Sequence, residues 1–126
     1  PHIYYFSFPF NAVEYDEKKR KEIANKTDLP LMHFTAFLLL HNSRHKGVNN
    51  SGGNDGMVDV DAALSPPDEP NIKYTEGMEY NPGIWHVMPI RVGDHGTAIG
   101  LLADKEETHN FYLNIMDMFK EIERKK

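Results

Sequence analysis

The expected fold depends most on the segment Gly83-Ile84-Trp85-His86-Val87-Met88-Pro89-Ile90-Arg91-Val92-Gly93-Asp94-His95-Gly96. Its apolar part is short and ends at Gly93, which is typical of a buried β-strand that runs into a turn. His95 follows in that turn, between Asp94 and Gly96. A strand that leads into a glycine-bounded turn holds one imidazole rigidly at the rim of a sheet. The pattern makes His95 a candidate catalytic residue.

A second turn, Asn54-Asp55-Gly56, lies upstream, just before the apolar pair Met57-Val58. Such a turn most often exists because glycine accepts a positive φ, and a lone acid in it is usually solvated. Asp55 is nevertheless the acid that we expect to face His95 at one rim of a shared sheet. Their side chains would then touch, although they are far apart along the chain.

Length and charge limit the classes of protein to consider. The chain has 126 residues, 40% of them hydrophobic, which is enough for one domain with a core. Acidic residues outnumber basic ones by 19 to 14. This balance argues against a nucleic-acid partner, because phosphate binding depends on clustered positive charge. The one basic run, residues 18–21, is flanked by Asp16, Glu17 and Glu22 and fits a solvated surface.

The sequence contains no cysteine and no apolar run long enough to cross a membrane. Without cysteine, disulfides and thiolate metal sites are excluded. The longest apolar run, residues 34–40, is far shorter than the roughly 18 residues that a spanning helix needs. Residues 1–126 are not expected to include a signal peptide, because the first expected strand begins almost at once. A chain that opens inside a strand is expected to be part of something larger.

One strand and one helix stand out in the first third of the chain. Residues 3–8 are β-branched or aromatic on both faces, as in a parallel-sheet strand that is covered from both sides. Residues 31–41 predict a helix with Thr27 and Asp28 as N-cap candidates. This helix is apolar nearly all round, so we expect it to be buried on most sides.

Surface segments are expected to join these elements. Residues 11–27 are polar, with a weak helical tendency over 14–24. Residues 42–56 are rich in turn formers and predict a loop. A short extended segment is expected after it, over residues 57–60. Residues 65–83 contain four prolines, so we expect them to be irregular.

The chain closes on an amphipathic helix. Asp104 and Glu107 have capping-box spacing. The apolar residues recur at the helical period: Phe111, Tyr112, Ile115, Met118, Phe119 and Ile122. This helix should dock against a sheet, yet only two strands are convincing, and two strands leave too much surface uncovered. We therefore expect an α/β fold with parallel strands and flanking helices that is incomplete without chain outside residues 1–126.

Other candidate sites are weaker. His86 alternates with Trp85 inside the strand and is expected in the core or in support of the site. Residues 51–62 superficially resemble an EF-hand loop, but the twelfth position, which needs a bidentate acid, is Ala62. An EF-hand is therefore excluded, while a looser calcium site stays open. The remaining histidines are expected to be structural or solvated: His2, His33, His41, His45 and His109.

Several segments carry a resemblance to a known family. They are Ile3-Tyr4-Tyr5-Phe6-Ser7, Asn54-Asp55-Gly56-Met57-Val58, Gly83-Ile84-Trp85-His86-Val87-Met88-Pro89, Gly93-Asp94-His95 and Asn110-Phe111-Tyr112. In this order they resemble the C-terminal third of the secreted triacylglycerol lipases of staphylococci and thermophilic bacilli. The resemblance covers most of the chain outside residues 9–28 and 65–80. The combination of the motifs is specific, whereas no single motif is.

The resemblance implies the C-terminal portion of an α/β-hydrolase with a Ser-Asp-His triad, in the chain order serine, acid, histidine. Asp55 matches the acid and His95 the histidine. No G-x-S-x-G motif occurs in residues 1–126, so the serine and the oxyanion hole are expected in an N-terminal part. The implied protein is an extracellular hydrolase of lipid esters. Alone, these 126 residues are expected to be inactive.

The resemblance also bears on metals and on rival functions. Relatives that hold calcium near this histidine carry carboxylates just after it, where this chain has Thr97 and Leu102. The zinc site of the bacillar enzymes would lie upstream, and triad chemistry requires no cofactor. Two alternatives stay open: a non-catalytic or calcium-binding interaction module on the same fold, and an esterase for short, soluble esters.

Overall fold

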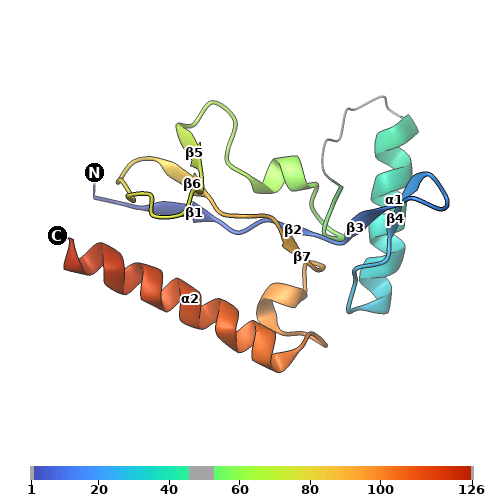
Figure 1. The fold of residues 1–126 in the computed structure, drawn as a ribbon. Helices are drawn as coiled ribbons and strands as arrows, with labels where there is room; N and C mark the ends of the chain where they lie inside the picture. Colours follow the sequence, from blue (N-terminus) through green and yellow to red (C-terminus); the bar gives the residue numbers. More distant parts are fainter. Residues whose placement is uncertain (1, 46–52, 126) are drawn as a thin grey trace.

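Residues 2–45 and 53–125 are described by a computed structural model, in which short strands form a layer and a long helix runs along it (Figure 1). A second long helix packs beside a hairpin at one end of the molecule. The elements of the described residues are, in order, β1 Tyr5–Ser7, β2 Phe10–Asn11, β3 Val13–Asp16, β4 Lys21–Ala24, α1 Pro30–His45, the 3₁₀ helix η1 Val60–Ala63, β5 Asn71–Lys73, β6 Trp85–Val87, β7 Arg91–Val92, the 3₁₀ helix η2 Thr97–Ile99 and α2 Lys105–Arg124.

The two strands expected from the sequence are present and parallel. β6 lies between β1 and β5, with Phe6 opposite His86. β5 corrects the expectation that residues 65–83 are irregular throughout, because Ile72 pairs in parallel with His86 on the other side. The prolines permit this strand since Pro70 precedes it, and the Pro70 carbonyl accepts a hydrogen bond from the Trp85 amide at 2.8 Å.

Prolines divide both long strands. Pro9 separates β1 from β2, and Pro89 separates β6 from β7. Proline has no amide hydrogen to donate to a neighbouring strand, so the ladder is interrupted at both places. The pairing resumes in parallel, with Phe10 opposite Arg91. β7 thus continues the path of β6 and delivers the chain to Gly93.

The helical tendency expected over residues 14–24 is wrong. These residues form an antiparallel hairpin, in which Val13 lies opposite Ala24 and Asp16 opposite Lys21. The Asp16 carboxylate accepts hydrogen bonds from the amides of Lys18 and Lys19, both at 3.0 Å, which closes the turn. The Lys19 amide bond is the main reason that the pKa of Asp16 is lowered. Residues 18–21 are exposed at the hairpin tip, as the sequence predicted.

α1 is longer than expected, and within the described residues it is not buried on most sides. Ala36 and Leu40 pack with Val13 and Ala24 of the hairpin in a small core. The opposite side of α1 is exposed, with Leu31 at 67% and Phe34 at 58%. The expectation that this helix is buried on most sides is therefore wrong for the described residues. Residues 42–45 belong to α1 rather than to the expected loop, and residues 46–52 of that loop lie outside the described residues.

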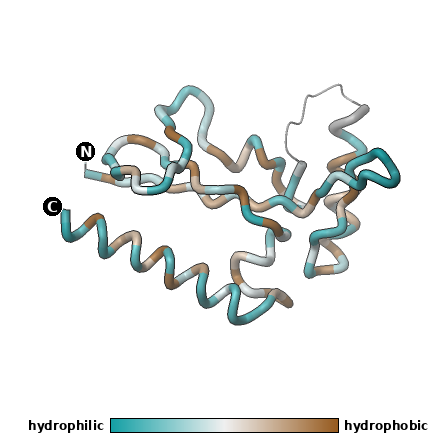
Figure 2. Tube along the Cα trace, in the orientation of Figure 1, coloured by the Kyte–Doolittle hydropathy of each residue, from teal (hydrophilic) through white to brown (hydrophobic). Residues whose placement is uncertain are grey.

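α2 docks along the strand layer as expected. Asp104 Oδ1 accepts a hydrogen bond from the Glu107 amide at 2.9 Å, which satisfies one free donor of the first turn. Phe111 is buried, and its ring packs edge-on against Phe8 and Phe10. Brown and teal alternate along α2 at the helical period in Figure 2. Neither helix in the described part of the chain has the length and apolarity that a membrane crossing requires.

We expect Phe111→Ala to destabilise the protein by about 3–5 kcal/mol, because a buried aromatic ring leaves both lost contacts and a cavity. Arg91 adds to this loss, since its guanidinium lies 4.7 Å from the centre of the Phe111 ring. Urea unfolding of the protein measures the change. Leu113→Ala is the matched control on the same helix, since Leu113 is 47% exposed. Equal destabilisation by the two variants would contradict this account of α2.

Candidate active site

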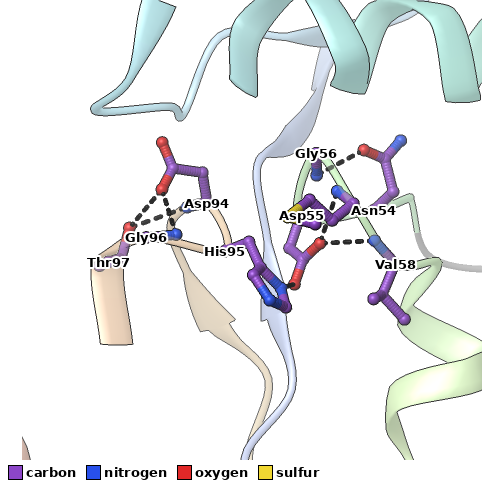
Figure 3. A network of polar contacts seen from close by, with 9 residues as sticks. Asn54, Asp55, Gly56, Val58, Asp94, His95, Gly96 and Thr97 are labelled. Atoms are coloured by element: carbon purple, nitrogen blue, oxygen red, sulfur yellow. Dashed lines mark hydrogen bonds and ion pairs between the residues drawn. The ribbon is translucent and has the colours of Figure 1, made fainter. Parts of the chain in front are cut away.

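Asp55 and His95 are in direct contact, as the sequence predicted. Asp55 Oδ2 lies 2.8 Å from His95 Nδ1 (Figure 3). The side chain of Asp55 is only 9% exposed, whereas that of His95 is 48% exposed. The carboxylate is thus shielded behind the imidazole, and the imidazole faces outward.

The acid turn orients its carboxylate. Asp55 Oδ1 accepts hydrogen bonds from the amides of Met57 at 2.9 Å and Val58 at 2.7 Å. The second oxygen, Oδ2, is left to face His95. Backbone donors from its own turn therefore fix one side of this carboxylate, and the imidazole occupies the other.

The backbone also joins the two turns. The His95 amide donates to the Asp55 carbonyl at 2.8 Å. Gly93 has φ of +147°, and a Cβ there would lie 2.6 Å from Thr97 Oγ1. Gly56 has φ of +95°, where a Cβ would lie 3.1 Å from the Met32 carbonyl oxygen. Glycine is needed at both positions for the turns to close on each other.

This geometry assigns chemical roles to the two nitrogens of the His95 ring. A carboxylate at Nδ1 stabilises the tautomer that carries its proton on Nδ1. Nε2 then has a free lone pair and can accept a proton from a group placed beside it. The half-exposed ring leaves room for such a group. The arrangement is that of a general base held by an acid.

Asp94, although next to His95 in sequence, does not hold the imidazole. Its side chain is fully buried and points away from the ring (Figure 3). Its oxygens accept from the amides of Asp28, Leu29 and Gly96. Asp55 is therefore the acid that faces the ring.

His86 lies in the core, which is one of the two places expected for it. It is fully buried, with its ring stacked on Phe6 at a centroid distance of 5.1 Å. The Asn81 amide donates to His86 Nε2 at 3.1 Å, so Nδ1 carries the proton and donates to the Tyr5 carbonyl, also at 3.1 Å. Both nitrogens are thus used in holding the strands and the loop before β6. His2, His33, His41 and His109 are exposed, as expected for solvated histidines.

Thr97 and Leu102, the two positions singled out after His95, offer no carboxylate to a cation. The Thr97 hydroxyl donates to Asp28 Oδ2 at 3.0 Å, and Leu102 is 68% exposed and has no donor oxygen in its side chain. Hard cations such as calcium require six to eight oxygen ligands. Across residues 2–45 and 53–125, no group of three or more His, Asp or Glu side chains is placed to hold a metal ion.

Sequence reasoning missed the contribution of Asn54. This side chain is fully buried, donates to the Ala36 carbonyl of α1 at 3.2 Å and accepts from the Gly56 amide at 2.9 Å. It therefore attaches the acid turn to the middle of α1. In the sequence, Asn54 before Asp55-Gly56 indicates only a turn, because no local pattern predicts a hydrogen bond from its side chain to a distant helix.

The fold and the paired residues together indicate a class of protein. Parallel strands, flanking helices and an acid–histidine pair on two adjoining turns are typical of α/β-hydrolases. No protein-family model matches the chain, and no curated protein sequence matches it significantly.

Among solved structures, the chain is similar to the lipase of Staphylococcus hyicus. The TM-score is 0.70 and the sequence identity is 29%. The match covers 100% of this chain and 33% of the lipase, so the chain spans about a third of the length of that protein. The chain therefore has a lipase-like α/β fold.

Proposed function

We propose that this chain supplies the acid and the histidine of a Ser-Asp-His triad in a carboxylic-ester hydrolase of the triacylglycerol lipase type. The observation that carries the proposal is the 2.8 Å contact between Asp55 Oδ2 and His95 Nδ1. The likeness to a lipase over the whole of this chain supports it. Asp55 and His95 are the proposed catalytic residues, and lipid esters are the proposed substrates.

In this proposal the nucleophilic serine and the oxyanion hole belong to an N-terminal part outside residues 1–126. Two observations support such a part. The match spans only 33% of the Staphylococcus hyicus lipase. Large apolar side chains of the described residues are also exposed, as on a surface that further chain covers. On α1 these are Leu31, Phe34, Phe37 and Leu38.

The reaction follows from the orientation of His95. Nε2 takes the proton of the serine hydroxyl while the serine oxygen attacks the ester carbonyl. The imidazolium, stabilised by Asp55, then returns the proton to the leaving alkoxide, and an acyl-enzyme remains. Water repeats the sequence and releases the carboxylic acid, with His95 again as base and then as acid. No metal or organic cofactor takes part in these steps.

We also propose that the protein acts outside the cell.

We expect the 126-residue chain alone to hydrolyse no p-nitrophenyl ester above the buffer rate, and the protein with its N-terminal part to do so. A serine-directed fluorophosphonate should label the longer protein, with the label outside residues 1–126 by mass spectrometry. A label on Ser7, Ser43, Ser51 or Ser65 would overturn the proposed location of the nucleophile. Absence of both labelling and hydrolysis would favour a non-catalytic module.

The chain length of the preferred acyl group separates a lipase from an esterase. Turnover of emulsified long-chain triacylglycerols supports the lipase assignment. Turnover limited to short, soluble esters would replace it with the esterase, while leaving the roles of Asp55 and His95 unchanged.

A further inference from the structure

We propose that Asp94 is a positioning residue, which fixes the orientation of His95 by tying the histidine turn to the start of α1. The proposal rests on the proposed function of His95. Its main readout, however, is a proton resonance of His95 and does not depend on ester hydrolysis. It assigns a role to a buried acid that takes no direct part in the triad.

The carboxylate of Asp94 binds two separate parts of the chain. Oδ2 accepts hydrogen bonds from the amides of Asp28 at 2.7 Å and Leu29 at 2.9 Å, immediately before α1. Oδ1 accepts from the Gly96 amide at 2.8 Å, within the histidine turn. These bonds link segments that are 65 and 66 residues apart in sequence.

Burial makes these bonds strong determinants of the local structure. Asp94 has no exposed surface. A buried carboxylate is costly unless donors replace its water, so the three backbone amides are required partners. The start of α1 is also a favourable place for a negative charge, because the first amides of a helix carry partial positive charge. The acid is thus held in one position.

His95 lies between two points that this acid anchors. The Gly96 amide on one side donates to Asp94 Oδ1, and the Asp94 amide on the other side donates to Thr97 Oγ1 at 2.9 Å. Thr97 Oγ1 in turn donates to Asp28 Oδ2 at 3.0 Å. The backbone of His95 is therefore fixed on both sides, while its side chain points to Asp55 (Figure 3).

The variant Asp94→Asn tests this role with almost no change in shape. Both oxygens of Asp94 accept backbone hydrogen bonds, whereas an amide has one acceptor oxygen and an NH₂ group. The NH₂ group must therefore face either the amides before α1 or the Gly96 amide, and one side of the link is lost. A small misplacement of a catalytic group lowers the rate steeply.

In the full-length protein we expect Asp94→Asn to lower kcat by about 10- to 100-fold, with KM changed less than about twofold. The downfield ¹H resonance of His95 Nδ1–H should broaden or move upfield, because its bond to Asp55 loosens. The matched control is Asp104→Asn, which changes an acid at the start of α2, and there kcat and the resonance should be unchanged. A folded Asp94→Asn protein with unaltered kcat and an unaltered resonance overturns the proposal.

Two further measurements keep the test decisive. If Asp94→Asn does not fold, Thr97→Val removes only the hydroxyl that joins Asp94 to Asp28, and a smaller loss of kcat with a shifted resonance is expected. In the wild-type protein the Asp28 and Leu29 amides should exchange slowly with solvent, and fast exchange overturns the link. If the wild type hydrolyses no ester, the proposed function fails, while the resonance and the exchange still decide the role of Asp94.

Discussion

Replacing His95 by Ala in the protein with its proposed N-terminal part is expected to lower kcat by on the order of 10⁶-fold, because His95 is the proposed base of the triad. Without the imidazole, no group beside the serine can take its proton, and the protonated hydroxyl is a poor nucleophile. Any residual rate above that of water would come from the oxyanion hole and from substrate binding. Initial rates with a p-nitrophenyl ester at saturating concentration measure the effect.

The fold should tolerate this substitution, since the His95 side chain is 48% exposed. Its backbone bond to Asp55 does not involve the ring. Thermal unfolding should therefore show nearly unchanged stability. His109→Ala is the matched control, because His109 lies exposed on α2 and should keep wild-type kcat. A His95→Ala protein that retains near-wild-type turnover would show that another group is the base.

Local sequence patterns correctly predicted those elements in which residue propensity and tertiary packing favour the same structure. The cap at Asp104 and the apolar period of the last helix predicted α2, whose N-cap is Asp104. The contact between Asp55 and His95 was also predicted, because two glycine-bounded turns in the order of a known family limit where the side chains can point. These signals are short-range, or they depend on motifs read in combination.

Long-range pairing decided the elements that the sequence did not reveal. Residues 14–24 are charged like an exposed helix, but their hairpin is stabilised by packing of Val13 and Ala24 against α1. β5 exists because β6 offers a free edge to Ile72. Propensity is a weak guide where such tertiary contacts compete with it.

The same limit applies to the site. Asp94 was recognised beside His95, yet its bonds reach Asp28 and Leu29, far away in sequence. Asn54 likewise bonds to Ala36 in α1. Asn54 ties the acid turn to α1, and Asp94 ties the histidine turn to the residues immediately before α1. Both turns are thus attached to α1 or to the residues just before it, and no local motif records these bonds.

Asp55→Asn is expected to lower kcat by about 10⁴-fold, the second largest effect. The oxygen of the new amide can still accept from the Met57 and Val58 amides, so the turn should keep its shape. The NH₂ group would then face His95 Nδ1, which must accept rather than donate. The proton of the ring moves to Nε2, and the nitrogen beside the serine can no longer act as a base.

Kinetics and tautomer can be measured on the same Asp55→Asn protein. ¹⁵N spectra of the imidazole should show the proton on Nδ1 in the wild type and on Nε2 in the variant, with kcat reduced accordingly. Asp59→Asn, four residues away, is the matched control and should change kcat by less than about tenfold, because Asp55 is the acid in contact with the ring. A loss below tenfold for Asp55→Asn, together with a large loss for Asp59→Asn, would transfer the role of the acid to Asp59. Such a result would require a rearranged acid turn in the active protein, since Asp55 Oδ2 lies 2.8 Å from His95 Nδ1 in the structure.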